Sequence, residues 1–314
     1  MNDYFILYFS LYIPPHLLQE LAMKLTSDFA GTRLRDHTCR VSARWTMNCA
    51  ASIDDPNPLY FDDERSGGII APPLFPVAIT WPIIERIGDY IEAETFPKEV
   101  IFTQVHYTEH LSIHRPVRPG DSLVIKGEIA AILPHRAGTH VVLQFNAFDS
   151  KSKPVFTEHI GAMMRGVQCS DGGKGGDAVP ALPGHRESDR SLWDSNIFIH
   201  PLSPYIYDGC TNIHFPIHTS VQFARQVGLP AIIHQGTRTL ALAVREIINR
   251  ETSGDPLPVK VISCRFTGMV LPGSGITVRL ASKNRTPEGT RLFFSVINAE
   301  GRKAISDGHI MLNQ

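Results

Sequence analysis

The sequence predicts an α+β protein built from two similar halves, each with one central helix and a curved antiparallel sheet. Two observations support this prediction: motifs recur in the same order about 150 residues apart, and in each half a helical pattern is followed by strand-like alternation. A chain of 314 residues has room for two domains of about 150 residues each.

A Pro-Gly pair and an asparagine show the duplication most clearly. Pro119-Gly120 recurs 153 residues later as Pro272-Gly273, and Asn146 recurs 152 residues later as Asn298. A third match is a proline-containing loop that stands earlier in each half. Three matches in one order and at nearly constant spacing indicate an internal duplication.

The clearest helical pattern follows Gly236, where no further Pro or Gly interrupts the run and apolar residues stand at helical spacing: Leu240, Val244, Ile247 and Ile248. The corresponding run of the first half, LFPVAITWPIIERIGDYI, contains Pro76 and Pro82. Because proline lacks an N–H and clashes with the preceding turn, we expect that helix to be kinked.

The segments after each Pro-Gly pair predict strands. GITVRLASK and RLFFSVINA, for example, alternate apolar and polar residues and contain many β-branched ones. A helix lying across a curved antiparallel sheet buries one face of each. We expect edge strands of the two sheets to pair, so that the halves share one continuous sheet.

Residues 168–195 are rich in Gly, Ser, Pro and charged side chains, which predicts a linker. The predicted domains are therefore residues 1–167 and 196–314. The first residues, MNDYFILYFSLYIPP, are apolar, but they have neither a basic start nor a cleavage motif. We expect them to begin a strand or helix that packs on the body of the protein.

Composition argues against several classes of partner and cofactor. The net charge is -1 with no basic block, which disfavours nucleic acid or a membrane surface as a partner. The five cysteines form no CxxC pair, so we expect free thiols in a reducing, cytoplasmic compartment. No cluster has metal-ligand spacing and no G-x-G-x-x-G motif follows a strand, so we expect neither a metal nor a dinucleotide.

The two proline-containing loops carry two versions of one motif, with different polar residues in each. The first reads DDPNPLY, and the second reads NIHFPIH and is followed by GLPAIIHQG. Together with the Pro-Gly strands, these stretches resemble the MaoC-like hydratase/dehydratase family, which includes the (R)-specific enoyl-CoA hydratases (hydratase 2) and has a loop of the form D-x-N-P-[IL]-H. The resemblance implies a tandem (double) hot-dog fold. It also implies addition or removal of water across C2–C3 of an acyl thioester of CoA or acyl carrier protein, without a cofactor.

That reaction requires three kinds of group. A proton moves at C2, the oxygen at C3 gains or loses a proton, and negative charge develops on the thioester oxygen. A histidine and a carboxylate suit the two proton transfers, and an amide can hold the water. Backbone N–H groups at a helix N-terminus suit the developing charge, because they are unpaired and lie at the positive end of the helix dipole.

The second half holds the expected catalytic groups. His218 stands at the histidine position of the motif, and Gly236 begins the predicted helix. A lone histidine is more often a surface or core residue, but the resemblance implies that His218 is the acid/base and that the Gly236 N–H binds the thioester oxygen. Ile213 and Phe215 replace the Asp and Asn of the motif, and with Gln235 they are expected to line the substrate.

The missing loop carboxylate leaves three explanations open. The first, which we favour, is that Asp208 or Asn212 supplies the polar group from nearby, so both are candidate catalytic residues. The second is that Asp55 supplies the carboxylate across the pseudo-twofold axis. The third is that His218 works alone, for an easier proton transfer or an isomerisation.

The first half is expected to have lost its chemistry. Tyr60 stands at the histidine position and is a poor base at neutral pH, while Pro72-Pro73 precedes the helix without an N–H to donate. Asp55 and Asn57 remain at the motif positions, although such residues are also typical of turns. We expect this half to bind the acyl chain, with Asp55, Asn57 and Tyr60 near the substrate.

An alternative function follows from the departures at Ile213 and Phe215. The protein would then be a non-catalytic acyl-thioester-binding scaffold, or a MaoC-like protein repurposed as an isomerase or cyclase. A homodimer is optional in either case, because two halves in one chain already complete the pseudo-dimer.

Overall fold

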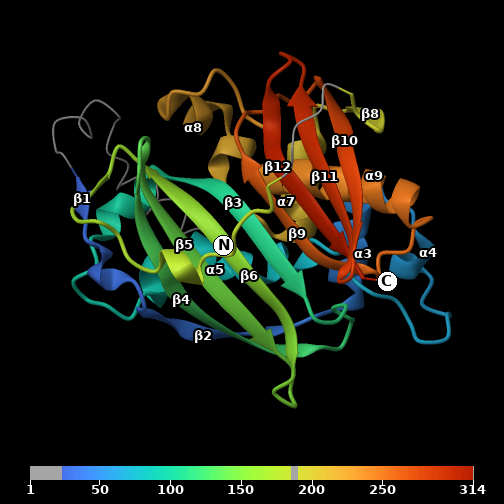
Figure 1. Cartoon of the computed structure of the whole chain (residues 1–314), viewed down its shortest axis with the longest axis horizontal. Coiled ribbons are helices and arrows are strands. Elements are labelled where there is room, and N and C mark those ends of the chain that lie inside the picture. The colour runs from blue at the N-terminus through green and yellow to red at the C-terminus, as the bar shows by residue number, and fades with distance from the viewer. Residues whose placement is uncertain (1–22, 185–189, 314) are drawn as a thin grey trace.

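One antiparallel sheet of ten strands runs through both halves of the chain, with the central helices α5 (Phe75–Glu85) and α9 (Gly236–Glu251) behind it in the view of Figure 1. The computed structural model describes residues 23–184 and 190–313. The element predicted at the extreme N-terminus lies outside these residues.

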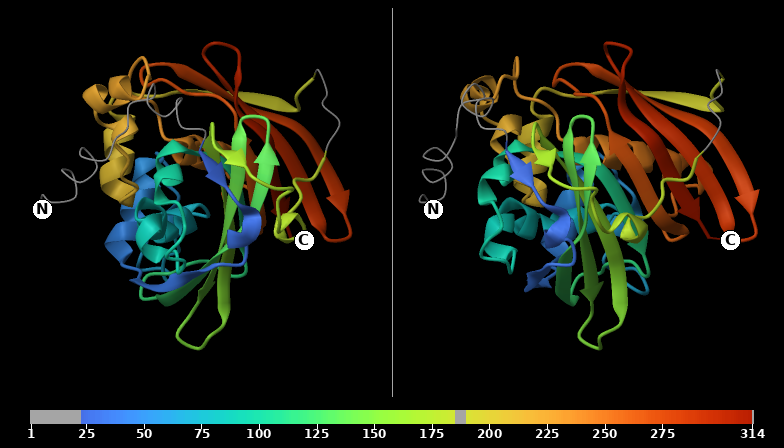
Figure 2. Two further views of the ribbon diagram at one scale, coloured as in Figure 1. Left: turned by 90° about the vertical axis from the view of Figure 1, so that its left-hand side faces the viewer. Right: turned by 60° about the vertical axis from the view of Figure 1, so that its left-hand side comes forward.

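The N-terminal half wraps its strands around four helices. Figure 2 shows this sheet curving around the helices, which lie on its inner side. The helices are α3 (Ala43–Ser52), α4 (Pro58–Phe61), α5 and α6 (Ile87–Tyr90), with short 3-10 turns at Ser27–Phe29 and Lys98–Thr103. The strands are β2 (Arg33–Arg40), β3 (Gln104–Ile113), β4 (Ser122–His135), β5 (Gly138–Phe148) and β6 (Pro154–Arg165).

The C-terminal half repeats this plan. Its helices are α7 (Ser203–Thr211), α8 (Val221–Gln226) and α9, with a 3-10 turn η4 at Pro216–His218. Its strands are β8 (Trp193–Phe198), β9 (Val259–Phe266), β10 (Gly275–Thr286), β11 (Gly289–Asn298) and β12 (Lys303–Leu312). Each half is thus a helix wrapped by a curved antiparallel sheet, which is the tandem hot-dog fold that the resemblance implied.

The two sheets join through β3 and β9. The strand order is β2-β4-β5-β6-β3-β9-β12-β11-β10-β8, and β3 pairs antiparallel with β9 from Thr108 opposite Arg265 to Ser112 opposite Val261. The predicted continuous sheet is confirmed. The two halves therefore share backbone hydrogen bonds as well as side-chain contacts.

The two Pro-Gly turns adopt the same conformation. Gly120 has φ 91° and Gly273 has φ 82°, in the left-handed region that favours glycine. The Gly120 N–H donates to Val41 O at 2.9 Å, and the Gly273 N–H donates to Ile199 O at 2.7 Å. Equivalent turns bonded to equivalent segments support the internal duplication.

The central helices of the two halves differ in length. α9 has 16 residues without an interior proline, whereas α5 has 11 residues with Pro82 inside it. α5 ends three residues after Pro82, and the short α6 follows. The proline therefore interrupts the first helix, as its missing N–H predicts.

The predicted linker contains some regular structure. Its first residues form β7 (Gln168–Cys169), which pairs with β1 (Lys24–Leu25), and a 3-10 turn follows at Gly176–Ala178. Its last residues already belong to β8, at the edge of the C-terminal sheet. Among the residues that the structure describes, no helix is long and apolar enough to cross a membrane.

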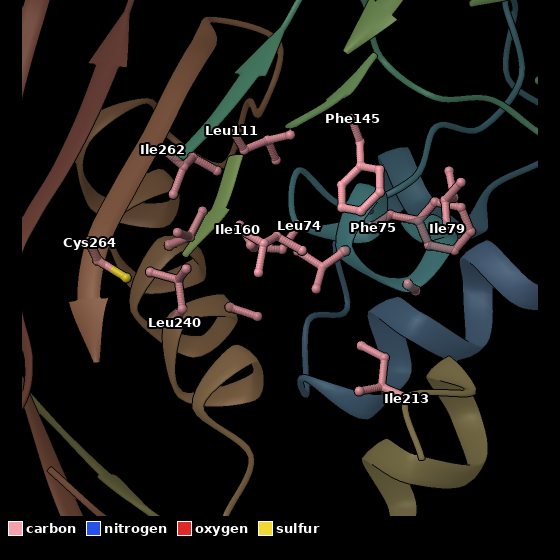
Figure 3. Close-up of a cluster of buried hydrophobic side chains, with 14 of the residues drawn as sticks. Leu74, Phe75, Ile79, Leu111, Phe145, Ile160, Ile213, Leu240, Ile262 and Cys264 are labelled. Carbon is pink, nitrogen blue, oxygen red and sulfur yellow. The ribbon is translucent and has the colours of Figure 1, made fainter. Parts of the chain in front are cut away.

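A hydrophobic core fills the space between the sheet and the two central helices. Figure 3 shows Phe75 and Ile79 of α5, Leu111 of β3 and Leu240 of α9 within this core. The helices α3 and α7 also touch across the halves, where the Trp45 Nε1–H donates to Thr211 O at 3.0 Å. The loops that carry the motif extend from these two helices.

Candidate active site

His218 is held at the end of its loop by the segment that leads into α9. The backbone N–H of Ile233 donates to Ile217 O at 3.2 Å, and His218 Nδ1 lies 2.8 Å from Ile233 O. Burial lowers the pKa of His218 to about 4, although the bond to Ile233 and the charge of Asp208 act to raise it. The imidazole is therefore neutral at pH 7.

Gly236 is the first residue of α9, so its N–H belongs to the turn that has no intrahelical partner. A side chain at this position would meet the ring of Phe266, whose Cδ1 and Cε1 lie 3.0 and 3.2 Å from the place of a Cβ. Phe266 is the last residue of β9. The start of α9 and the end of β9 thus face each other beside the His218 loop.

Ile213 and Phe215, which replace the Asp and Asn of the motif, have mostly apolar surroundings. Ile213 is 3% exposed and belongs to the main core, where Figure 3 draws it with Phe75 and Ile79. Phe215 packs its ring near His218 and Phe223, with centroids 6.4 Å apart in each pair. A carboxylate at position 213 would be buried among hydrocarbon side chains.

Asp208 and Asn212, the proposed sources of the missing polar group, have different surroundings. Asp208, on α7, pairs with His214 at 3.3 Å and raises the pKa of that histidine, and its charge also acts on His218. Asn212 is exposed and caps α7 with φ 62°. A left-handed asparagine is a common end to a helix, so the cap explains this residue without a catalytic role.

Gln235 and its neighbours bind protein groups. The Gln235 Nε2–H donates to Pro204 O at 2.8 Å, while its Oε1 is buried with no partner among the described residues. His234 lies between Thr239 Oγ1 at 2.9 Å and Arg238 Nη1 at 3.0 Å. Burial lowers the pKa of His234 well below its usual value, and the positive charge of Arg238 adds to this effect.

Arg238 ties the start of α9 to the first loop. Its buried guanidinium donates to Ser52 O at 2.7 Å and to Asp54 Oδ2 at 2.9 Å. Replacing Arg238 with alanine is expected to lower the free energy of unfolding by about 3 kcal/mol, because the buried Ser52 carbonyl and the buried His234 ring lose a charged donor. Urea unfolding at pH 7 measures this change. Arg238→Lys keeps the charge without the planar guanidinium, so its stability should fall between those of the wild type and Arg238→Ala. An unchanged urea midpoint in Arg238→Ala would contradict a stabilising contact between α9 and the first loop.

The first loop is docked onto the C-terminal half. Asn57 Nδ2 donates to Gly254 O at 2.5 Å, and its Oδ1 accepts from the Leu59 N–H at 3.0 Å, which caps α4. Tyr60 is 1% exposed and packs in a small cluster with Ala50 and Ile70. The Asn57 amide, expected near the substrate, therefore makes structural bonds at the contact between the halves.

Asp55 is 4% exposed and lines a small pocket together with Tyr60, Pro72 and Pro73. Burial raises its pKa, and one carboxylate oxygen accepts from the Asn57 N–H at 3.2 Å. Pro72 and Pro73 also line a neighbouring pocket together with Leu257 and Lys260. These pockets lie in the first half's counterpart of the site, where we expected the acyl chain.

Asp55 lies beside the middle of α9, whereas His218 lies beside its start. Asp55 shares its pocket with Arg245, which is nine residues beyond Gly236 and roughly 13 Å further along the helix axis. His218 is bound next to the start of the helix. The explanation in which Asp55 supplies the carboxylate across the halves stays a hypothesis.

Comparison with known protein families gives one match for each half. The model of the MaoC like domain matches residues 202–303, which include the His218 loop and the whole of α9. The model of the FAS1-like dehydratase domain region matches residues 28–158. The C-terminal half therefore contains a MaoC like domain, and the N-terminal half matches a dehydratase region.

Relatives of this MaoC-like chain match both halves at low identity. It is 23% identical over 273 residues to peroxisomal multifunctional enzyme type 2 of Drosophila melanogaster, covering 85% of the chain but only 44% of that enzyme. It is also 23% identical to peroxisomal enoyl-CoA hydratase 2 of Arabidopsis thaliana, covering 83% of the chain and 84% of the relative. A crystal structure of a MaoC-like dehydratase from Phytophthora capsici superposes with a TM-score of 0.77 at 20% identity, covering 91% and 98% of the two chains.

The MaoC-like motif did not reveal every polar group near the site. His214, His234 and Arg238 were not singled out from the sequence, although the HQG stretch before α9 was a usable signal for His234. Their roles depend on partners from α7 and from the first loop, which no local pattern shows. In the described ranges, no three His, Cys, Asp or Glu side chains are grouped to hold a metal ion.

Proposed function

We propose that the chain is a hydratase/dehydratase that adds or removes water across C2–C3 of an acyl thioester of CoA or acyl carrier protein. The observation that carries this proposal is the position of His218, which is bound to Ile233 O three residues before the start of α9. The match of residues 202–303 to the MaoC like domain supports the same reaction class.

His218 is suited to act as the base toward water. If Nδ1 carries the proton and donates to Ile233 O at 2.8 Å, the lone pair of the ring lies on Nε2. Burial keeps the imidazole neutral, so this lone pair is available at pH 7. In the hydration direction, Nε2 takes a proton from the water whose oxygen bonds to C3.

The first turn of α9 is suited to stabilise the thioester oxygen. Gly236 has no side chain to cover its N–H on the side of Phe266, and the helix dipole places partial positive charge there. Negative charge that develops on the thioester oxygen as the C2=C3 electrons move would be stabilised by this N–H. The oxyanion role of Gly236 is part of the proposal.

The charge of Asp208 acts on His218, but the ion pair of Asp208 is with His214. Its negative charge would stabilise the His218 imidazolium once the proton has been taken. We therefore assign Asp208 an electrostatic role, and the second proton transfer needs another group.

The proposal is tested by incubating the full chain with 2-enoyl-CoA thioesters of increasing chain length and with their acyl-carrier-protein forms. Loss of enoyl-thioester absorbance and a gain of 18 mass units, the mass of water, are the expected results. The buried Ile213 at the position of the loop acid favours the alternative, an acyl-thioester-binding scaffold. Binding without turnover at every chain length would support that alternative and contradict the proposed enzyme.

A further inference from the structure

Two glutamates are fully buried near the junction of the halves. Glu109 on β3 and Glu158 on β6 are 0% exposed, and their carboxyl groups lie close enough for each to shift the pKa of the other. Burial raises the pKa of both well above the usual value, and the charge of Glu109 raises that of Glu158 further. Both shifts favour the protonated carboxylic acids over the charged carboxylates.

His106 is the ionisable side chain that approaches this pair. Its Nε2 lies 3.3 Å from Glu109 Oε2 and 3.2 Å from Thr108 O. In one tautomer Nε2–H donates to the Thr108 carbonyl, and in the other Nε2 accepts from the Glu109 carboxylic acid. Changing from the first to the second moves the ring proton to Nδ1.

A β-bulge places His106 on the same face as Glu109. Residues three apart in a regular strand point to opposite faces. The pairing of β3 with β6 shifts between His106 and Thr108, so that Tyr107 is an extra residue. The extra residue reverses the alternation and turns His106 toward Glu109.

The bulge also brings His106 to the start of α9. Its ring packs against Phe266 with centroids 4.6 Å apart, and Phe266 is the residue that covers Gly236. The His106 side chain is 24% exposed, unlike the glutamates behind it. Within residues 23–184 and 190–313, its Nδ1 makes no hydrogen bond, so this nitrogen is available to a ligand.

We propose that His106, supported by Glu109, is the second proton-transfer residue of the site, contributed by the N-terminal half in place of the loop carboxylate that Ile213 removes. This inference rests on the proposed hydratase function. It assigns the N-terminal half a chemical role in addition to binding the acyl chain.

The proposed step conserves protons and electrons. In hydration, the water oxygen bonds to C3 while one of its protons passes to Nε2 of His218, and the C2=C3 π electrons move to C2 and the thioester oxygen. C2 then takes the proton from Nδ1 of His106 as Nε2 of His106 takes one from the Glu109 carboxyl. His218 then releases its proton to solvent, Nδ1 of His106 takes a proton from solvent, and Nε2 of His106 returns its proton to Glu109. Dehydration reverses each transfer.

The test compares His106→Gln and Glu109→Gln with the wild-type full chain in the enoyl-CoA hydration assay. We expect kcat to fall about 100-fold in His106→Gln and about tenfold or more in Glu109→Gln. Deprotonation of Glu109 should make the wild-type kcat fall at alkaline pH, and this fall should be absent in Glu109→Gln. His106 and Glu109 act on each other, and Glu158 acts on both. The charge of Glu109 also raises the pKa of Tyr207 and of Cys264.

The matched control is His110→Gln. His110 lies on the same strand and also has a pKa lowered to about 4 by burial, but it follows Glu109 directly and packs against His159 on the other face of the sheet. Its kcat and pH profile should match the wild type. Circular dichroism melting of each variant separates a loss of folding from a loss of catalysis. Glu158→Gln is a second variant of the buried Glu109–Glu158 pair.

Unchanged kcat and pH profile in folded His106→Gln and Glu109→Gln, with His218→Gln inactive, would overturn this inference and leave the proposed function standing. A loss of rate without any change in the pH profile of Glu109→Gln would also overturn it, because a merely structural carboxyl would behave that way. A wild-type chain that turns over no thioester would reject the proposed function, and this inference with it.

Discussion

Replacing His218 with glutamine is expected to lower kcat/KM for hydration of a 2-enoyl thioester by about 100-fold or more. Glutamine can keep the donor bond to Ile233 O, which His218 Nδ1 approaches at 2.8 Å, but it has no basic lone pair for the water. The loss should therefore appear in kcat more than in KM, because binding of the thioester is not changed. Initial rates over a range of substrate concentrations separate the two constants.

His200→Gln is the control for this variant. His200 is an exposed histidine of the same half, whose Nδ1 accepts from the Leu202 N–H at 3.2 Å. Its kinetics should equal those of the wild type. Equal activity in folded His218→Gln would show that the water is activated elsewhere and would remove the assignment of the base.

Replacing Glu109 with glutamine is expected to stabilise the protein increasingly as the pH rises. Burial raises the folded-state pKa of Glu109 above the ordinary value of 4.5, so the stability that its protonated form contributes is complete below about pH 4.5 and is lost as the pH rises toward the folded pKa. Glutamine cannot ionise and avoids this loss. The advantage of the variant should grow by on the order of 1.4 kcal/mol per pH unit above pH 5, until the folded pKa is reached.

Urea unfolding at intervals from pH 5 to pH 8 measures this trend, provided that the m-value stays constant. Glu158→Gln should behave in the same way, because its carboxyl is buried beside that of Glu109. Glu94→Gln, which changes an exposed glutamate, should show no pH-dependent difference. A constant difference between Glu109→Gln and the wild type at all pH values would contradict a buried, protonated pair.

The duplicated architecture could be predicted because its signals are local. The Pro-Gly turns at Gly120 and Gly273 need a left-handed glycine, and the run after Gly236 has the spacing of a helix that buries one face. The pairing of the two sheets also followed, since edge strands need partners. These features depend on short stretches of sequence and on general rules of chain geometry.

The surroundings of the site could be predicted only in part, because they depend on contacts between distant residues. Nothing local in DDPNPLY shows that Asn57 bonds to Gly254 rather than to substrate, or that Asp55 lies beside Arg245. The bulge that turns His106 toward Glu109 is likewise invisible in the HYTEH stretch. The motif, by contrast, identified His218 as the candidate base, and this role stays a prediction until it is assayed.

The shared strand pair of β3 and β9 restricts how a substrate can enter. Five residues of each strand face each other along this seam, so opening the molecule like a hinge would break a row of main-chain bonds. We therefore expect the two halves to keep their relative position while a thioester binds and leaves. Access to Gly236 then depends on small local movements, such as rotation of the Phe266 ring or a shift of the segment before α9.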